Sequence, residues 1–83
     1  MDIKIYSSPG CFYCEKAIEL CDRAGVEYKK IIVGGDITLQ EFQVLFPNVS
    51  QYPHVTIDDK VIGGLVPFAK YFITEGLVSA RKD

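Results

Sequence analysis

Apolar and polar residues alternate over residues 3–6, at the start of the chain. A short segment with this period of two is typical of a β-strand. Residues 7–10 contain a proline and a glycine, which indicate a loop. Over residues 12–24 the period lengthens to that of a helix, whose apolar face holds Ala17, Leu20, Cys21 and Ala24. Gly25 is placed to end this helix.

The remaining chain predicts five further elements. They are a strand at residues 28–33, a helix at 39–46, a hairpin of strands 54–57 and 61–62 joined by 58–60, and a last helix with Pro67 in its first turn that ends near Gly76. Thr38 and Glu41 have the spacing of a capping box, in which each side chain accepts a hydrogen bond from the other residue's backbone N–H. This pair predicts the start of the second helix.

The predicted order of elements is β-α-β-α-β-β-α, which makes this an α/β chain. A strand–helix–strand unit joins two parallel strands by a right-handed crossover, and the hairpin adds antiparallel strands. The pattern therefore predicts a four-stranded mixed sheet flanked by three helices on its two faces. No linker or repeat interrupts the 83 residues, so we expect one domain over residues 1–83.

Charge and hydropathy exclude several classes of function. The formal net charge is −2 and the basic residues are scattered, so binding of nucleic acid through its phosphates has no support. A membrane-spanning helix would need a run of about 18 apolar residues, and none is present. Residues 1–5 lack the charged-then-apolar layout of a signal peptide, which favours a cytoplasmic location.

The candidate chemistry lies in the tetrapeptide Cys11-Phe12-Tyr13-Cys14, at the expected start of the first helix. Two thiols at this spacing can close into a disulfide and reopen. The positive end of a helix dipole stabilises a thiolate, which is the species that attacks disulfides. The sequence therefore predicts a thiol–disulfide oxidoreductase in which Cys11 attacks and Cys14, one turn further in, resolves. Tyr13 is either a wall of the substrate groove or a partly exposed aromatic residue.

A zinc site is an alternative use of two such cysteines, and zinc normally takes four ligands. Only Cys21 and His54 remain as Cys or His candidates. Cys21 lies on the apolar face of the first helix, where a small buried side chain is the simpler interpretation. His54 is either a proton shuttle to Cys14 or an ordinary strand residue, and exchange between thiolates does not require the shuttle. No metal is therefore expected.

The motifs and their order resemble the glutaredoxin family over nearly the whole chain. The matching segments are Ile5-Tyr6-Ser7-x-Pro9-x-Cys11-x-Tyr13-Cys14, Gly25-Val26-Glu27-Tyr28, Tyr52-Pro53 and Val61-Ile62-Gly63-Gly64. The resemblance implies the thioredoxin fold and a cis Tyr52-Pro53 peptide bond that faces the two cysteines. It also implies glutathione as reductant and co-substrate, and disulfide-containing or glutathionylated proteins as partners. We expect the protein to be a monomer.

The resemblance also implies a glutathione-binding groove. Its expected residues are Tyr13, Gln51, Tyr52, Pro53, Gly63, Gly64, Leu65 and Val66. Tyr52 would pair its backbone with the cysteinyl part of glutathione, and such extended pairing gives affinity without side-chain specificity. The turn after the paired glycines would hold the γ-glutamyl end near Leu65 and Val66.

Several positions depart from the family pattern. Phe12 stands where proline is usual, and Ser8 stands where a basic residue is common. Acidic residues usually follow the paired glycines, but Leu65-Val66-Pro67 follows them here. The γ-glutamyl ammonium then lacks a carboxylate partner. A charge-assisted hydrogen bond contributes about 1.5–3 kcal/mol, so we expect glutathione binding about tenfold weaker, or weaker still.

Two alternatives to a glutathione-dependent oxidoreductase stay open. The chain could be recycled by a thioredoxin-reductase-type enzyme, as in the small redoxins that donate electrons to ribonucleotide reductase. It could instead bind an Fe–S cluster between two protomers through Cys11 and glutathione. The bulk of Phe12 and the weakened groove count against the cluster.

Overall fold

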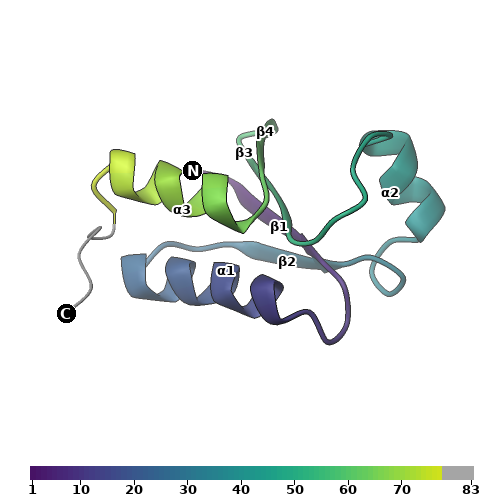
Figure 1. Cartoon of the computed structure of the whole chain (residues 1–83), viewed down its shortest axis with the longest axis horizontal. Helices are drawn as coiled ribbons and strands as arrows, with labels where there is room; N and C mark the ends of the chain where they lie inside the picture. The colour runs from purple at the N-terminus through teal and green to yellow at the C-terminus, as the bar shows by residue number, and fades with distance from the viewer. Residues whose placement is uncertain (78–83) are drawn as a thin grey trace.

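The computed structural model describes residues 1–77, which form a four-stranded sheet and three helices (Figure 1). In chain order the elements are β1 (Ile3–Ser7), α1 (Phe12–Ala24), β2 (Lys29–Ile32), α2 (Leu39–Leu45), β3 (His54–Ile57), β4 (Lys60–Gly63) and α3 (Leu65–Thr74). This order confirms the predicted succession. The expected domain, 1–83, also contains residues 78–83, which lie outside the described residues.

The sheet has the strand order β2-β1-β3-β4, with β1 and β3 at its centre. β1 pairs with β2 in parallel and with β3 in antiparallel orientation, so the sheet is mixed as predicted. Ile5 lies opposite Val55, and Tyr6 lies opposite His54. Because neighbouring residues of a strand point to opposite faces, this register places the Ile5 pair on one face and the Tyr6 pair on the other.

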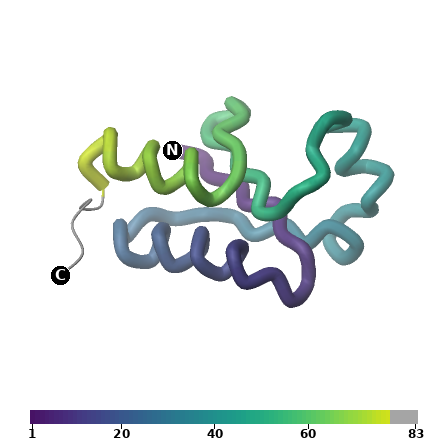
Figure 2. Tube along the Cα trace, in the orientation of Figure 1, coloured from purple at the N-terminus to yellow at the C-terminus, as the bar shows by residue number. Residues whose placement is uncertain are grey.

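The helices α1 and α3 pack side by side against the first of these faces (Figure 2). They close the main core of the protein with the apolar residues of β1 and β3. The fully buried members of this core are Ile3, Ile5, Ala17, Cys21, Val55, Ile57, Phe68 and Phe72. Burial of such apolar area is the principal force that holds the two helices on the sheet.

The opposite face is covered by α2, which lies at the other end of the molecule from the last turns of α3 (Figure 1). Phe42 is the buried residue of this seven-residue helix. It packs in a second, smaller cluster with Tyr6, Ile31 and Val33. The position of α2 therefore depends on few apolar contacts.

The predicted helix boundaries rest on local signals that the structure confirms. Gly25 ends α1 in the left-handed conformation, with φ of 69°. The capping box at α2 is complete. The Glu41 N–H donates to Thr38 Oγ1 at 3.0 Å, and the Thr38 N–H donates to Glu41 Oε1 at 2.9 Å. Both ends are therefore specified by backbone chemistry within a few residues.

Most predicted strand and helix boundaries differ from the structure by only one or two residues. The hairpin turn consists of Asp58 and Asp59 alone, with φ of 51° and 67°, and Lys60 already belongs to β4. A two-residue turn with both φ values positive matches the twist of the flanking strands. Leu65 and Val66, expected in a turn after the paired glycines, are the first residues of α3. Pro67 is its third residue and lies within the first turn, as predicted. No helix within residues 1–77 is long and apolar enough to cross a membrane.

Candidate active site

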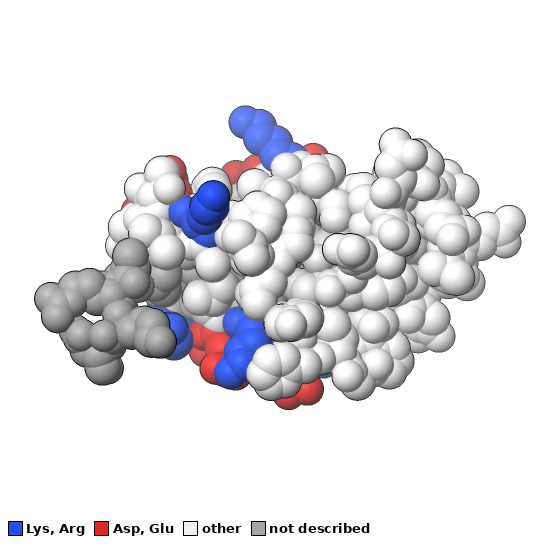
Figure 3. Space-filling model, in the orientation of Figure 1, with Lys and Arg blue, Asp and Glu red and all other residues white. Residues whose placement is uncertain are grey.

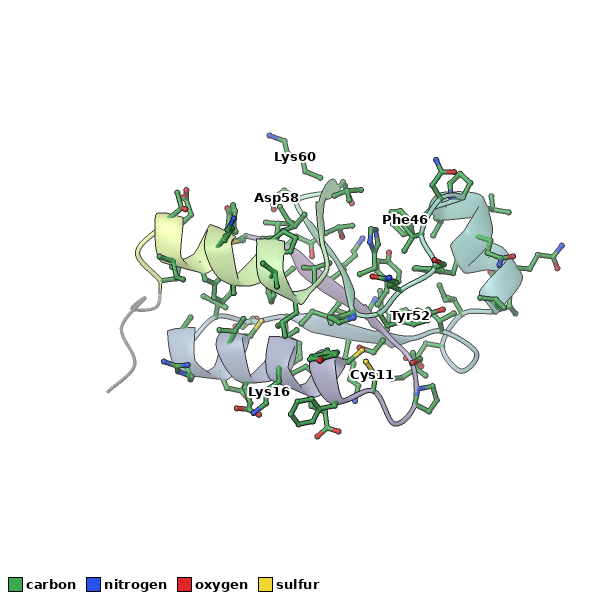
Figure 4. All side chains as sticks on the ribbon, viewed as in Figure 1. Cys11, Lys16, Phe46, Tyr52, Asp58 and Lys60 are labelled. Atoms are coloured by element: carbon green, nitrogen blue, oxygen red, sulfur yellow. The ribbon has the colours of Figure 1, made fainter. Side chains whose placement is uncertain are left out.

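Three points of the chain meet at one end of the sheet and define the candidate site. The chain leaves β1 after Ser7, enters β3 at His54 and leaves β4 after Gly63. Because β3 is antiparallel to both neighbours, these three points lie at the same end. Figure 4 shows Cys11 at the start of α1 and Tyr52 on the segment before β3, both at this end.

Cys11 is the N-cap residue of α1 and is half-buried. Its extended backbone lets Sγ accept a hydrogen bond from the Cys14 N–H, at 3.2 Å. An N-cap side chain satisfies one of the free N–H groups at a helix start. A thiolate in this position accepts a charge-assisted bond at the positive end of the helix. The prediction that Cys11 lies at the start of the helix is confirmed.

Cys14 lies one turn into α1 and is only 2% exposed. Burial raises the pKa of the Cys14 thiol, and its hydrogen bond with Cys11 raises the pKa further. Hydrogen bonds from the Ser8 backbone and the Ser7 side chain lower the pKa and partly offset these effects. Cys11 is therefore the more accessible sulfur, and the raised pKa of Cys14 favours its protonated thiol form.

Cys21 has no exposed surface and belongs to the main core. Burial raises its pKa to about 11, so it remains an unreactive thiol at neutral pH. This burial agrees with the interpretation of Cys21 as a small core side chain. Among residues 1–77, no three His, Cys, Asp or Glu side chains are grouped so that they could hold a metal ion.

A groove of about 600 Å³ extends from Tyr13, the residue between Phe12 and Cys14. Its lining residues are Tyr13, Asn48, Val49, Ser50, Gln51, Tyr52, Pro53, His54, Gly64, Leu65 and Val66. The structure thus brings together seven of the eight residues that were expected around glutathione. Gly63 is the exception.

The Tyr52-Pro53 peptide bond is cis, which confirms the expectation from the family resemblance. Gly64 lies close to it, since a Cβ on Gly64 would be 3.6 Å from the Pro53 carbonyl oxygen. Gly63 has φ of +117°, a conformation that L side chains rarely adopt. A Cβ on Gly63 would also approach Pro67 Cγ to 3.1 Å. Gly63 therefore shapes the entry into α3 and does not line the groove.

This arrangement matches a known family. The sequence model described as Glutaredoxin aligns with residues 3–62. The chain belongs to the glutaredoxin family. Its fold is accordingly the thioredoxin-like α/β fold, and its chemistry is glutaredoxin-type thiol–disulfide exchange at a CxxC pair, here Cys11 and Cys14.

Individual relatives support the glutaredoxin assignment. The chain is 36% identical over 70 residues to the hybrid peroxiredoxin hyPrx5 of Haemophilus influenzae, a match that covers 84% of this chain but only 29% of that protein. It is 35% identical over 63 residues to the probable glutaredoxin ssr2061 of Synechocystis sp., covering 75% and 72% of the two chains. Reduced glutaredoxin of Escherichia coli superposes with a TM-score of 0.72 at 27% identity, covering 93% and 98%.

Likeness of fold does not distinguish the two candidate reductants of a glutaredoxin. The glutathione complex of a buckwheat glutaredoxin superposes with a TM-score of 0.69 at 21% identity, covering 90% of this chain and 70% of the other. The NrdH-redoxin of Escherichia coli superposes with a TM-score of 0.68 at 21% identity, covering 84% and 93%. Only the residues that line the groove can therefore distinguish the two reductants.

The groove of this glutaredoxin carries little charge. None of the eleven residues that line it is Lys, Arg, Asp or Glu. Figure 3 shows the same character over α2 and the segment leading to β3, where the visible face has no charged side chain. The lining is instead polar amide, hydroxyl and apolar. Ligand recognition here must depend on backbone groups, uncharged polar side chains and apolar contact.

His54 lines the inner end of the groove but is 3% exposed, so it is more deeply buried than an ordinary strand residue. Its ring lies among aromatic rings, with centroids 4.4 Å from Phe46, 5.9 Å from Phe42 and 6.2 Å from Tyr6. Burial lowers the pKa of His54, so the imidazole is neutral at neutral pH. We interpret His54 as part of the packing that supports the groove.

The sequence interpretation missed four groove residues, namely Asn48, Val49, Ser50 and His54. The first three precede Gln51 in a loop whose composition gives no sign of a site. Ser7 was also missed as a neighbour of Cys14. The Ser7 hydroxyl is buried, and its contact with the Cys14 thiol lowers the pKa of Cys14. Among the described residues it has no other hydrogen-bond partner. Nothing in the local sequence separates such residues from ordinary loop and strand positions.

Proposed function

We propose that the chain reduces disulfides with Cys11 as the attacking thiol and Cys14 as the resolving thiol, and that glutathione re-reduces it. The observation that carries this proposal is the contrast between the two sulfurs. Cys11 is reachable at the helix start, whereas Cys14 is buried one turn later. Tyr13, which lies between them in the chain, lines the groove together with Pro53.

The proposed reaction has two exchange steps. The Cys11 thiolate attacks one sulfur of the substrate disulfide, and the other sulfur leaves as a thiolate. The Cys14 thiolate then attacks Cys11 Sγ, releases the remaining substrate thiolate and closes the Cys11–Cys14 disulfide. Two electrons pass from the protein to the substrate. Two glutathione molecules return them and leave as glutathione disulfide.

The environment of Cys14 suits the second step. A negative charge on Cys11 is one cause of the raised Cys14 pKa, after burial and the hydrogen bond between the two sulfurs. In the mixed disulfide Cys11 no longer carries that charge. Ionisation of Cys14 therefore becomes easier at the point where a second nucleophile is needed.

The groove offers part of what glutathione requires. The first N–H groups of a helix have no partner within the helix, and Gly64 adds no side-chain cap to α3. Leu65 and Val66 can thus present N–H groups to a carboxylate. The Tyr52 backbone can pair with the cysteinyl part. Pro67 has no N–H, and no acidic side chain lines the groove to bind an ammonium group.

The incomplete fit supports a second candidate reductant. A flavoenzyme of the thioredoxin-reductase type presents a protein dithiol, so it does not need an ammonium-binding carboxylate in this groove. The uncharged lining and the exposed Val66, 67% accessible, are compatible with this second reductant as well as with a weak glutathione site. The Cys11 and Cys14 chemistry is the same in both cases.

Turnover with each reductant separately tests the proposal. The substrate is a small mixed disulfide of glutathione and 2-mercaptoethanol, and NADPH oxidation is followed with glutathione plus glutathione reductase, or with thioredoxin reductase alone. We expect turnover in the glutathione system. Turnover in the thioredoxin-reductase system alone would assign the second candidate. Absence of turnover in both, with dithiothreitol also ineffective, would contradict the oxidoreductase proposal.

Val66→Asp is expected to lower the KM for the glutathione mixed disulfide about tenfold, the equivalent of one charge-assisted hydrogen bond. Val66 is 67% exposed in the first turn of α3, where a carboxylate also suits the helix dipole, so folding is not at risk. Val66→Asn is the matched control without charge. The gain should diminish at high salt. An unchanged or raised KM would contradict the assignment of the γ-glutamyl end to this turn of α3.

We propose disulfide-containing or glutathionylated proteins as substrates, in a reducing compartment such as the cytoplasm. Catalytic rather than structural use of two neighbouring cysteines is typical of such a compartment. The similarity to part of a protein named hybrid peroxiredoxin makes an oxidised peroxiredoxin one substrate to assay. Ribonucleotide reductase is the corresponding substrate if a thioredoxin-reductase-type enzyme is the reductant.

A further inference from the structure

We propose that Phe12, Tyr13 and Val66 form an apolar rim that selects protein substrates with apolar residues next to the reactive disulfide. The inference rests on the proposed disulfide reduction and adds a substrate class to it. Phe12 would be the main specificity-determining residue, because it directly follows Cys11.

The three side chains are largely open to solvent. Phe12 is 65% exposed, Tyr13 60% and Val66 67%. The Phe12 and Tyr13 rings meet edge to face with centroids 5.7 Å apart, and Tyr13 and Val66 line the same groove. Phe12 and Tyr13 therefore form one continuous apolar surface at the start of α1, and Val66 adds an exposed apolar side chain to the groove that Tyr13 lines. Contiguous exposed apolar surface of this kind marks an interaction site more often than scattered single residues do.

The position of the rim identifies its occupant. Cys11 must come into bonding contact with a substrate sulfur before exchange can occur. Phe12 and Tyr13 immediately follow Cys11 in the chain. When the substrate sulfur reaches Cys11, the residues next to the substrate cysteine are therefore brought next to Phe12 and Tyr13. The occupant is thus the polypeptide on either side of the substrate cysteine.

The charges around the rim indicate which kind of residue can bind there next to the substrate cysteine. The lining of the groove has no charged side chain. The nearby ammonium of Lys16 lies 5.2 Å from the Phe12 ring centroid and 3.5 Å from the Glu19 carboxylate. Its charge is already opposed by Glu19, and its contact with the ring face helps to hold Phe12 in place. Glu15, three residues after Phe12, is also exposed, so the helix surface beside the ring carries charges of both signs. The apolar contact that the ring itself offers favours an apolar residue over an acidic or basic one.

The reaction at the rim is the exchange already described and needs no further reagent. The Cys11 thiolate forms a disulfide with the peptide cysteine, and the small thiol on that cysteine leaves as a thiolate. Cys14 then displaces the reduced peptide and closes the Cys11–Cys14 disulfide. The peptide gains the two electrons that the dithiol loses.

Three synthetic octapeptides test the proposal, each with one cysteine in a mixed disulfide with 2-mercaptoethanol. Leu flanks the cysteine on both sides in the first peptide, Asp in the second and Lys in the third. The reduced protein is mixed with each peptide, and the second-order rate constant of peptide release is measured. We expect the Leu peptide to react at least tenfold faster than the other two, about the discrimination that one apolar contact site provides.

Phe12→Ala is expected to reduce the preference for the Leu peptide to threefold or less, and Phe12→Leu to retain most of it. Val44→Ala removes an apolar side chain that is 76% exposed on the distant α2, and it should leave all three rates unchanged. Equal rates for the three wild-type peptides, a preference for the Asp or Lys peptide, or a Leu preference that survives in Phe12→Ala would overturn the rim.

Reduction of bis(2-hydroxyethyl) disulfide by the wild-type protein separates the two levels of the proposal. This disulfide has no peptide to contact Phe12. If it is reduced while the three peptides react at equal rates, the proposed substrate selection by the rim is wrong and the proposed disulfide reduction is supported. If neither it nor any peptide is reduced, the oxidoreductase proposal itself fails.

Discussion

Replacing Cys11 by serine is expected to abolish disulfide reduction, with a loss of at least a hundredfold that reaches the uncatalysed rate. Every electron passes through the bond that Cys11 forms with the substrate, and a serine hydroxyl does not make that bond. Cys14→Ser should keep part of the activity on a glutathione mixed disulfide, because a second glutathione can take over the resolving step. The measurement is NADPH oxidation in the glutathione-coupled assay.

The third cysteine supplies a matched control for this pair. Cys21 is fully buried in the main core, away from solvent. Cys21→Ala should therefore keep the full reduction rate, with a modest loss of stability from the small cavity. If Cys11→Ser retained full activity, or if Cys14→Ser lost as much as Cys11→Ser on the small mixed disulfide, the assigned roles would be wrong.

Truncating Phe42 to alanine is expected to lower the free energy of unfolding by about 3–5 kcal/mol, the usual cost of removing a buried aromatic ring. Phe42 is 1% exposed and is the buried residue of α2. Its ring centroid lies 5.5 Å from Tyr6, 5.4 Å from Phe46 and 5.6 Å from Tyr52. Because Tyr52 is part of the groove, the KM for the glutathione mixed disulfide should also rise.

Val44→Ala on the same helix is the control for Phe42→Ala. Val44 is 76% exposed, so its truncation should change stability by no more than about 0.5 kcal/mol, as is usual at the surface. Urea unfolding followed by circular dichroism gives both values, and the coupled assay gives the KM. A loss below about 1 kcal/mol in Phe42→Ala would show that α2 is held by contacts other than this ring.

Much of the secondary structure could be predicted because its signals are local. Thr38 and Glu41 satisfy each other's backbone groups, and Gly25 adopts a conformation that other residues avoid. Such interactions need only the neighbouring residues, so they can be recognised in the sequence. The hairpin turn was misplaced because Lys60 can serve equally well in a turn or an edge strand, and the pairing with β3 decides between them.

The candidate site could be predicted only in part. Cys11 and Cys14 are three positions apart, so their spacing alone indicates dithiol chemistry. The groove combines residues 48–54 with Tyr13 and residues 64–66, which are distant in the sequence. The family resemblance placed most of these residues, but it assigned Gly63 to the lining, where the structure shows a conformational role.

The sequence by itself determined the chemical identity of the active pair, the order of the elements and the loss of charge at Val66, since each depends on residue type and short spacing. Only the tertiary structure decided how deeply Cys14 is buried, that residues 48–50 and His54 complete the groove, and that Phe12 stands exposed beside Tyr13. Burial is the reason for this division. Burial depends on how α1, α2 and α3 pack on the two faces of the sheet. This packing brings together residues that are far apart along the chain, and local sequence patterns do not reveal such contacts.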